Sequence, residues 1–310
     1  MSIFLFILLN NIAPIFLIIY LGYILSKKFN LDIASLSKLN FYIFVPALSL
    51  VKIYQTDIDT NLLKVLLYAV VFLGVLMTVA TIIARFRGYS TSMKNAFKNS
   101  IMFYNSGNFA LPLVTLVFAD TQYAAYAVSI QIMVLLVQTL TTNTLGFYNA
   151  GRGQMHYKET IKKVFRMPPA YAVMLGIMLK WIPYDFTQSF LWPAINYMKN
   201  GLVPVALLTL GVQLSLTKFN FRNIEVYLTS LVRLIGGPVL AYLLILFLRI
   251  DGVMAQVLLI SSSVPSAVNT ALIAVEFDNE PDFASQVVLT TTVLSLFTLT
   301  GVIFISKYIF

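Results

Sequence analysis

Ten runs of mostly apolar residues, each close to the length of a membrane-spanning helix, limit what this chain can fold into. A helix needs about 20 consecutive apolar residues to cross the hydrocarbon core of a bilayer. The runs fall at residues 3–26, 33–53, 62–86, 95–119, 123–149, 168–183, 188–217, 222–248, 252–277 and 283–306. Charged residues make up only 11% of the chain, less than half the share of about 25% found in soluble domains. The sequence therefore predicts an all-α membrane protein of ten transmembrane helices.

The residue inventory argues against an enzyme. Cysteine is absent, and His156, the single histidine, lies in a polar, basic stretch. A zinc site or a serine–histidine triad needs more than this, and no phosphate-binding GxxxxGK[ST] loop is present. We expect no catalytic residues, no metal and no cofactor.

The net charge of +9 is best explained as a topology signal rather than as a nucleic-acid surface. If the N-terminus lies outside, the cytoplasmic loops hold fourteen Lys and Arg residues and the outer loops hold six. Cytoplasmic loops carry the excess of basic residues in membrane proteins. Four acidic residues between 276 and 282 fall on the same side, but acidic residues count little in this rule. We predict a cell-membrane protein with both termini outside the cytoplasm.

The two halves of the chain share short motifs in the same order. Pro14 and Gly22 in the first span, and Pro168 and Gly176 in the sixth, both have the spacing Pro-x7-Gly. The second span contains Val-Pro-Ala-Leu and the seventh contains Val-Pro-Val-Ala-Leu. Copies with an odd number of spans insert in opposite orientations, as in many secondary transporters. The predicted parts of this 5+5 inverted repeat are a first five-helix repeat (1–150), a cytoplasmic basic linker (151–166) and a second five-helix repeat (167–310).

Small, polar and helix-breaking residues interrupt two of the spans. The fourth reads Tyr-Asn-Ser-Gly-Asn-Phe-Ala-Leu-Pro at 104–112, and the ninth reads Ser-Ser-Ser-Val-Pro-Ser-Ala-Val-Asn-Thr at 261–270. Irregular backbone at membrane depth is tolerated only where protein or a water-filled cavity covers it. Interruptions at corresponding places in two halves point to a transport site. We predict crossed, broken fourth and ninth helices; two kinked packing helices are the alternative.

At these residues the sequence resembles the auxin efflux carrier family, which includes the plant PIN-type carriers and bacterial proteins assigned as malonate and malate carriers. The resemblance covers nearly the whole chain. It rests on Asn40 with 45–48, on 105–112, and on 265–270 followed by Glu276-Phe277. It implies ten helices as two inverted repeats, a scaffold domain, and a transport domain in which the fourth and ninth helices cross. It also implies small organic anions as substrates and a homodimer. The long cytoplasmic loop of the plant members has no counterpart here.

The two interruptions supply the residues expected to hold the substrate. Half-helix N-termini carry unpaired N–H groups and a partial positive charge, which suit a carboxylate without any fixed cation. We predict that Asn105 and Asn269 contact the substrate carboxylate; capping of a broken helix end is the alternative for each. The predicted substrate-binding residues are Asn105, Asn108, Ser266, Asn269, Thr270 and Arg233, and the residues predicted to shape the breaks are Gly107, Pro112 and Pro265.

Arg233 needs separate treatment because an arginine inside a span is costly without a partner or a wet cavity. It lies about eleven residues into the eighth span, and Glu225 is two turns away, too far to pair with it well. Arg233 can face the substrate cavity, brace the crossing backbone, or extend to the membrane surface. The sequence leaves these three interpretations open.

Further polar residues fall on four other spans. Asn40, Tyr42, Pro46 and Pro204 are predicted for the scaffold side of the site, with packing or kinking as an equal alternative. Polar stripes run along the fifth span (Gln131, Gln138, Thr139, Thr141, Thr142, Asn143) and the tenth (Thr290, Thr291, Thr292, Ser295). Hydrogen bonding between helices is the expected role of the stripes, and cavity lining is the alternative.

These features predict a secondary carrier that moves small organic anions by alternating access. Mono- or dicarboxylates such as malate or malonate are the expected substrates. All twelve acidic residues lie in loops or near span ends, so a cation antiporter is not expected. The alternatives are a sensor or receptor on the same fold that does not transport, and a symporter coupled to Na+ or H+.

Overall fold

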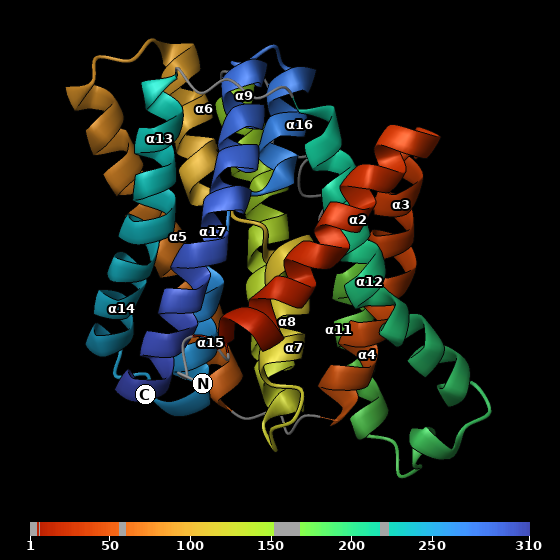
Figure 1. Cartoon of the computed structure of the whole chain (residues 1–310). Coiled ribbons are helices and arrows are strands. Elements are labelled where there is room, and N and C mark those ends of the chain that lie inside the picture. The colour runs from red at the N-terminus through yellow and green to blue at the C-terminus, as the bar shows by residue number, and fades with distance from the viewer. Residues whose placement is uncertain (1–4, 6, 56–59, 152–167, 218–222) are drawn as a thin grey trace.

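The chain folds into an all-helical bundle (Figure 1). The computed structural model describes residues 5, 7–55, 60–151, 168–217 and 223–310. Within these ranges every regular element is a helix, and the one β-type contact is an isolated antiparallel bridge between Tyr104 and Ser266. The all-α prediction is confirmed. His156 and, apart from Gly151, the predicted linker 151–166 lie outside the described residues.

Several helices contain a short π-helical segment, labelled η. The first half of the chain comprises η1 (Leu8–Ile12), α2 (Ala13–Phe29), α3 (Ile33–Leu39), η2 (Asn40–Phe44), α4 (Val45–Gln55), α5 (Thr60–Phe86), α6 (Thr91–Met102), η3 (Ser106–Ala110), α7 (Leu111–Val117), α8 (Ala124–Thr141), η4 (Thr142–Gly146) and α9 (Phe147–Ala150). The second half comprises α11 (Pro168–Lys180), the 3-10 turn η5 (Phe186–Gln188), α12 (Trp192–Leu216), α13 (Ile224–Leu231), η6 (Val232–Gly236), α14 (Gly237–Phe247), α15 (Gly252–Ser262), α16 (Val268–Glu276) and α17 (Pro281–Ile309).

Seven helices among the described residues are long and apolar enough to cross a bilayer. They are Leu8–Phe29, Ile33–Gln55, Leu63–Phe86, Ala124–Ala150, Trp192–Leu216, Ile224–Phe247 and Pro281–Ile309. Shorter apolar helices are Ser106–Val117, Tyr171–Lys180 and Gly252–Ser262. A structure with this many apolar helices fits a multi-pass membrane protein. The finer prediction of ten spans in a 5+5 repeat stays a prediction.

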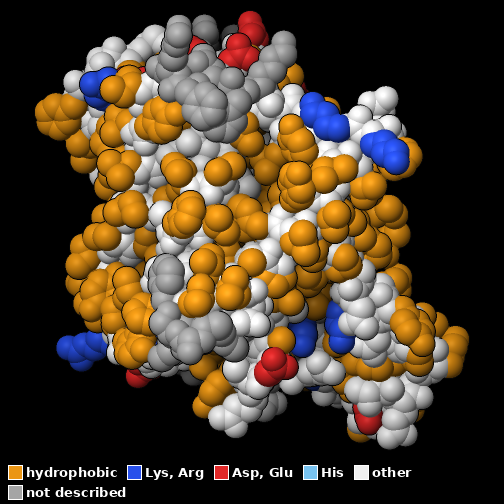
Figure 2. All heavy atoms as spheres, viewed as in Figure 1, with side chains coloured by type: hydrophobic (Ala, Val, Ile, Leu, Met, Phe, Trp, Pro, Cys, Tyr) orange, Lys and Arg blue, Asp and Glu red, His pale blue; other side chains and the backbone are white. Residues whose placement is uncertain are grey.

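The outer surface is apolar, as a lipid-facing surface must be. Figure 2 shows hydrophobic side chains over the middle of the molecule and charged side chains gathered towards the top and bottom of the view. Large apolar side chains on several helices are more than half exposed, among them Leu17, Leu67, Leu243, Phe247 and Phe297. Water would disfavour this arrangement, whereas hydrocarbon does not.

Close backbone contacts join helices from the two halves. α2 packs against α12, and α11 packs against α4. A Cβ added at Gly22 would clash with the backbone of Leu208, and one at Gly211 would clash with that of Ile19. Small residues allow such close approach between membrane helices. The contact explains why Gly22 of the first Pro-x7-Gly motif has no side chain.

Candidate functional site

Two interrupted helices meet at their interruptions. Residues 103–105 separate α6 from η3 and α7, and residues 263–267 separate α15 from α16. The N–H of Asn105 donates to the carbonyl of Pro265, and the N–H of Ala267 donates to the carbonyl of Phe103, both at 2.8 Å. Backbone groups released from helical hydrogen bonding therefore pair with each other, as a membrane interior demands.

Each interruption is held by hydrogen bonds from the next long helix in the chain, α8 for the first and α17 for the second. Gln138 on α8 accepts from the N–H of Tyr104 at 3.3 Å, and Gln131 on α8 donates to the carbonyl of Ser106 at 3.0 Å. Thr291 on α17 accepts from the N–H of Ser266 at 3.1 Å. Interhelical hydrogen bonding, the role expected for the two polar stripes, is thus found for these three residues.

A cavity of about 300 Å3 opens beside the paired interruptions. It is lined by Ser37, Asn40, Phe41, Val45, Tyr104, Asn105, Ser106, Gly107, Asn108, Leu135, Gln138, Thr139, Thr142, Asn143, Gln213, Ala267, Val268, Asn269 and Leu272. We call it the amide cavity, because asparagine and glutamine side chains supply much of its polar surface. None of the lining residues is charged. The starts of the Ser106–Val117 helix and of α16 both lie at its wall, so two helix N-termini contribute partial positive charge.

Asn105 combines the two roles that the sequence left open. Its Oδ1 accepts from the N–H of Asn108 at 3.2 Å and so caps the second half of the broken helix. Because an amide nitrogen cannot accept this bond, Nδ2 must point the other way. Nδ2 is buried and has no hydrogen-bond partner in the structure. An unpaired buried donor costs about 1–3 kcal/mol, so a ligand oxygen that reached Nδ2 would relieve this cost.

The other predicted binding residues divide into two groups. Asn108, Gly107 and Asn269 line the amide cavity, and Asn269 is exposed within it. Ser266 and Thr270 do not line it, because their hydroxyls are buried and donate to the carbonyls of Ser100 and Ala267, each at 2.6 Å.

Of the predicted prolines and scaffold residues, only Asn40 lines the amide cavity. Pro112 opens α7 and is buried, and Pro265 lies at the interruption, where its carbonyl accepts from Asn105; neither lines the amide cavity. Of the scaffold residues, Asn40 lines the cavity and donates to Thr209 at 3.1 Å. The other three do not line it: Tyr42 is 62% exposed, Pro46 is half-buried, and Pro204 is exposed on α12.

Arg233 lies at the interruptions, at the C-terminal ends of α6 and α15. It is fully buried, donates through Nη1 to the carbonyl of Ile101 at 2.9 Å, and donates through Nη2 to the carbonyl of Ser262. These carbonyls belong to the last turns of α6 and α15, where a cation is stabilised by the helix dipole. Its guanidinium carbon also lies 4.7 Å from the centroid of the Tyr104 ring. The contacts favour the brace among the three interpretations, and Arg233 does not line the amide cavity.

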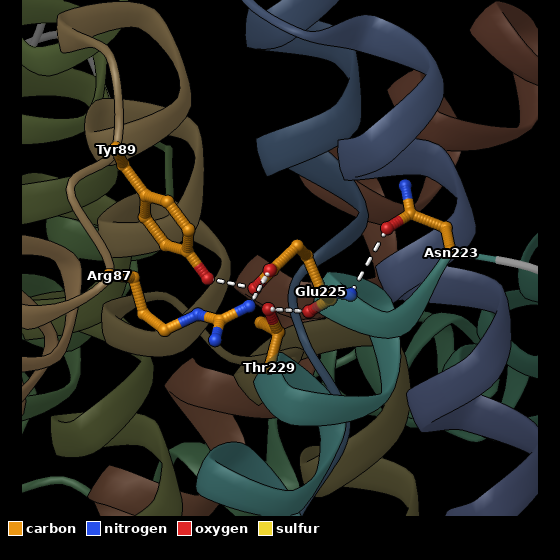
Figure 3. Close-up of polar contacts among 5 residues, drawn as sticks. All are labelled: Arg87, Tyr89, Asn223, Glu225 and Thr229. Atoms are coloured by element: carbon orange, nitrogen blue, oxygen red, sulfur yellow. Dashed lines mark hydrogen bonds and ion pairs between the residues drawn. The ribbon is translucent and has the colours of Figure 1, made fainter.

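Glu225, the acidic residue nearest to Arg233 on its own helix, is occupied elsewhere. As Figure 3 shows, its carboxylate accepts from Arg87 and from the hydroxyl of Tyr89, both beyond the end of α5. This ion pair joins the start of α13 to the loop between α5 and α6. Burial of the Tyr89 hydroxyl, together with its hydrogen bond to Glu225, raises the pKa of Tyr89 to about 12.

Sequence reasoning missed part of the cavity wall. Gln213 on α12 and Ser37 on α3 line the cavity but were not predicted. The cavity is also lined by four residues of the fifth-span stripe: Gln138, Thr139, Thr142 and Asn143. Cavity lining was only the alternative role predicted for this stripe. No motif marks Gln213 or Ser37. The signal available for the stripe was its run of polar residues on an apolar helix.

The side-chain amides and helix N-termini of the amide cavity can bind a small anion through several hydrogen bonds without a charged residue. Amide N–H groups and helix N-termini can donate to carboxylate oxygens. Among the described residues no group of three or more His, Cys, Asp or Glu could hold a metal ion. Among the described residues that line the cavity, no hydroxyl group has a His, Asp, Glu or Lys side chain beside it to act as a base.

Comparison with known proteins places this architecture among transporters. A family model described as membrane transport protein matches residues 7–303. An "Uncharacterized transporter" of Methanothermobacter thermautotrophicus is 23% identical over 297 residues, which cover 94% of this chain and 95% of that protein. A second, of Methanocaldococcus jannaschii, is 28% identical over 158 residues, 50% of this chain and 51% of that protein. A "Putative malonate transporter" of Rhizobium meliloti is 31% identical over 114 residues, 36% of each chain.

Proposed function

Because the chain belongs to the membrane transport protein family, which is the auxin efflux carrier family, we propose that it is a secondary carrier of small organic anions. The expected substrates are mono- or dicarboxylates such as malate or malonate, moved across the cytoplasmic membrane by alternating access. The matching family model confirms the family resemblance seen in the sequence. The substrate and the transport mechanism are proposals. A small-molecule substrate and membrane embedding follow from the family; the homodimer stays a prediction.

The observation that carries the proposal concerns Asn105, which lines the uncharged cavity and whose buried Nδ2 donor has no hydrogen-bond partner among the described residues. Asn269 and two helix N-termini border the same space. A carboxylate placed there could accept hydrogen bonds from side-chain amides and from N–H groups at the helix starts. The cavity volume of about 300 Å3 lies at the small end of ligand pockets, which favours a compact substrate. Malonate is a compact dicarboxylate, and the name of the Rhizobium relative supports this choice.

We further propose that ten helices form the 5+5 inverted repeat, with halves at 1–150 and 167–310. Two kinds of reciprocal contact support it. The first predicted span packs on the seventh (α2 on α12), and the sixth packs on the second (α11 on α4). The fourth and ninth are each interrupted and each supported by the next helix, α8 or α17. Contact between η1 and α17 agrees with two termini on one side, which we propose to be the outside.

The amide cavity also bears on coupling. Cation-coupled carriers bind their ion through carboxylates, unwound carbonyls or helix C-termini. No carboxylate lines the cavity, and Arg233 occupies the helix C-termini at the interruptions. These contacts favour an anion carrier driven by the membrane potential over a symporter coupled to Na+ or H+.

The test is binding and exchange of carboxylates by purified protein. Malonate, malate and a monocarboxylate are screened by thermal shift, and counterflow of labelled malonate is measured in proteoliposomes. We expect Asn105→Ala and Asn269→Ala to weaken both signals and Asn196→Ala to leave them unchanged. Asn196 is the matched control because it lies outside the amide cavity and donates to the carbonyl of Trp192. Binding without counterflow would favour the sensor instead, and unchanged uptake by both site variants would refute the contact.

A further inference from the structure

A second cavity lies along the same helices as the amide cavity. Its volume is about 280 Å3, and it is lined by Leu48, Lys52, Thr115, Ala119, Ala124, Val128, Lys199, Asn200, Leu202 and Val203. α4 and α12 form one wall, and α7 and α8, with the loop between them, form the other. Lys52 lies in the last turn of α4, and Lys199 lies in the second turn of α12. We call it the lysine cavity.

The two lysines carry charge that nothing in the described structure neutralises. Neither ammonium group has an ion pair or hydrogen bond among the described residues, and both side chains are half-buried. Both lysines line the same cavity. Asp120 follows the lining residue Ala119 but is exposed and pairs with neither. Two like charges in a partly buried space repel each other, and an anion between them would relieve that repulsion.

The lysine cavity lies at the other end of the interface that contains the amide cavity. On α8, Leu135 lines the amide cavity and Val128 lines the lysine cavity, two turns or about 10 Å apart. On α12, Gln213 lines the amide cavity and Val203 lines the lysine cavity, about 15 Å apart. Asn143 and Ser37 place the amide cavity towards the predicted cytoplasmic loops, so the lysine cavity faces the outer side.

We propose that Lys52 and Lys199 form an outer binding site for the carboxylate, at the extracellular end of the transport path. Two ammonium groups match a dicarboxylate, and Thr115 and Asn200 add neutral hydrogen-bonding groups. The anion occupies this site before it enters, or after it leaves, the amide cavity. The substrate class rests on the proposed carrier function, whereas the site itself can be tested without transport.

The absence of native cysteine makes a direct test possible. Thr115→Cys places a thiol of similar size in the lysine cavity, and Thr121→Cys places one in the exposed loop nearby as the control. Membrane-impermeant methanethiosulfonates, one anionic and one cationic, are applied from outside to intact cells. We expect the anionic reagent to modify Thr115→Cys about tenfold faster than the cationic one, because a positive cavity concentrates anions. Malonate should slow this reaction and leave Thr121→Cys unaffected.

Replacing the lysines identifies the source of the effect. In Thr115→Cys with Lys52→Gln and Lys199→Gln, the preference for the anionic reagent and the protection by malonate should both disappear. With Lys52→Arg and Lys199→Arg they should persist, which excludes misfolding as the cause. Lys307→Gln, exposed on α17 at the same predicted side, should change nothing. Equal rates for the two reagents, or no protection by malonate, would overturn the outer site.

Transport measured in parallel keeps the two proposals apart. We expect the KM for malonate in proteoliposomes to rise about tenfold in Lys52→Gln/Lys199→Gln, and less so at high ionic strength, where screening weakens the wild-type attraction. An unchanged KM with normal wild-type transport would overturn the outer site but leave the carrier. Protection by malonate without any transport would overturn the carrier but leave the outer site.

Discussion

Asn105→Asp separates the two roles of Asn105 in one substitution. Aspartate keeps an oxygen that can accept from the N–H of Asn108, so the cap on the broken helix survives. It removes the Nδ2 donor and adds a negative charge that repels a carboxylate. A hydrogen bond to a charged group contributes about 1.5–3 kcal/mol, and each 1.4 kcal/mol is tenfold in affinity. We therefore expect binding of malonate to weaken by about 10- to 150-fold or more, with the cap on the broken helix still in place.

The comparison with Asn105→Ala completes the experiment. Alanine loses the cap as well, which costs about 0.5–2 kcal/mol of stability. Titration calorimetry measures malonate affinity, and thermal unfolding in the same detergent measures stability. Asn105→Asp with wild-type affinity would refute the reasoning, because it would mean that Nδ2 never contacts the anion.

Three further predictions concern the frame around the site. Arg233→Met should cost about 2–6 kcal/mol, because it leaves two helix-end carbonyls unpaired, and thermal unfolding in detergent against Arg233→Lys, which keeps the charge, checks this. Gly211→Ala should abolish the folded, monodisperse protein because its methyl group would clash with the backbone of Ile19, whereas Gly74→Ala meets open space and should be neutral or slightly stabilising in size-exclusion and melting assays. Burial raises the pKa of Tyr89 from 10.0 to about 12. Its contribution to the free energy of unfolding is therefore present below pH 10 and lost as the pH rises through about 12. Tyr89→Phe should remove this loss of stability when the melting temperature is measured against pH.

The interruptions could be predicted from sequence because their composition conflicts with the rest of the span. Asn, Ser, Gly and Pro in an apolar run at 104–112 favour an irregular backbone that protein or a cavity covers. The same logic identified Asn105, Asn108 and Asn269, which line the cavity. It could not distinguish them from Ser266, because the direction of a side chain at an irregular backbone depends on dihedral angles that composition does not encode.

The sequence could not separate Asn40 from Tyr42, which were both predicted for the scaffold side of the site. Asn40 and Tyr42 fall in the π-helical segment η2, whose extra residue per turn shifts the face that each later side chain occupies. Asn40 lines the cavity while Tyr42 is exposed on the outer surface. The approach of Lys52 to Lys199 was equally hidden, since it depends on how α4 packs against α12.

The most direct test of the proposed carrier function is counterflow of labelled malonate into proteoliposomes preloaded with unlabelled malonate. We expect a transient, saturable accumulation that persists without Na+ and is lost in Asn105→Asp, because the substrate binds to neutral donors rather than with a cation. Accumulation that requires Na+, or none with any mono- or dicarboxylate despite a folded protein, would contradict it.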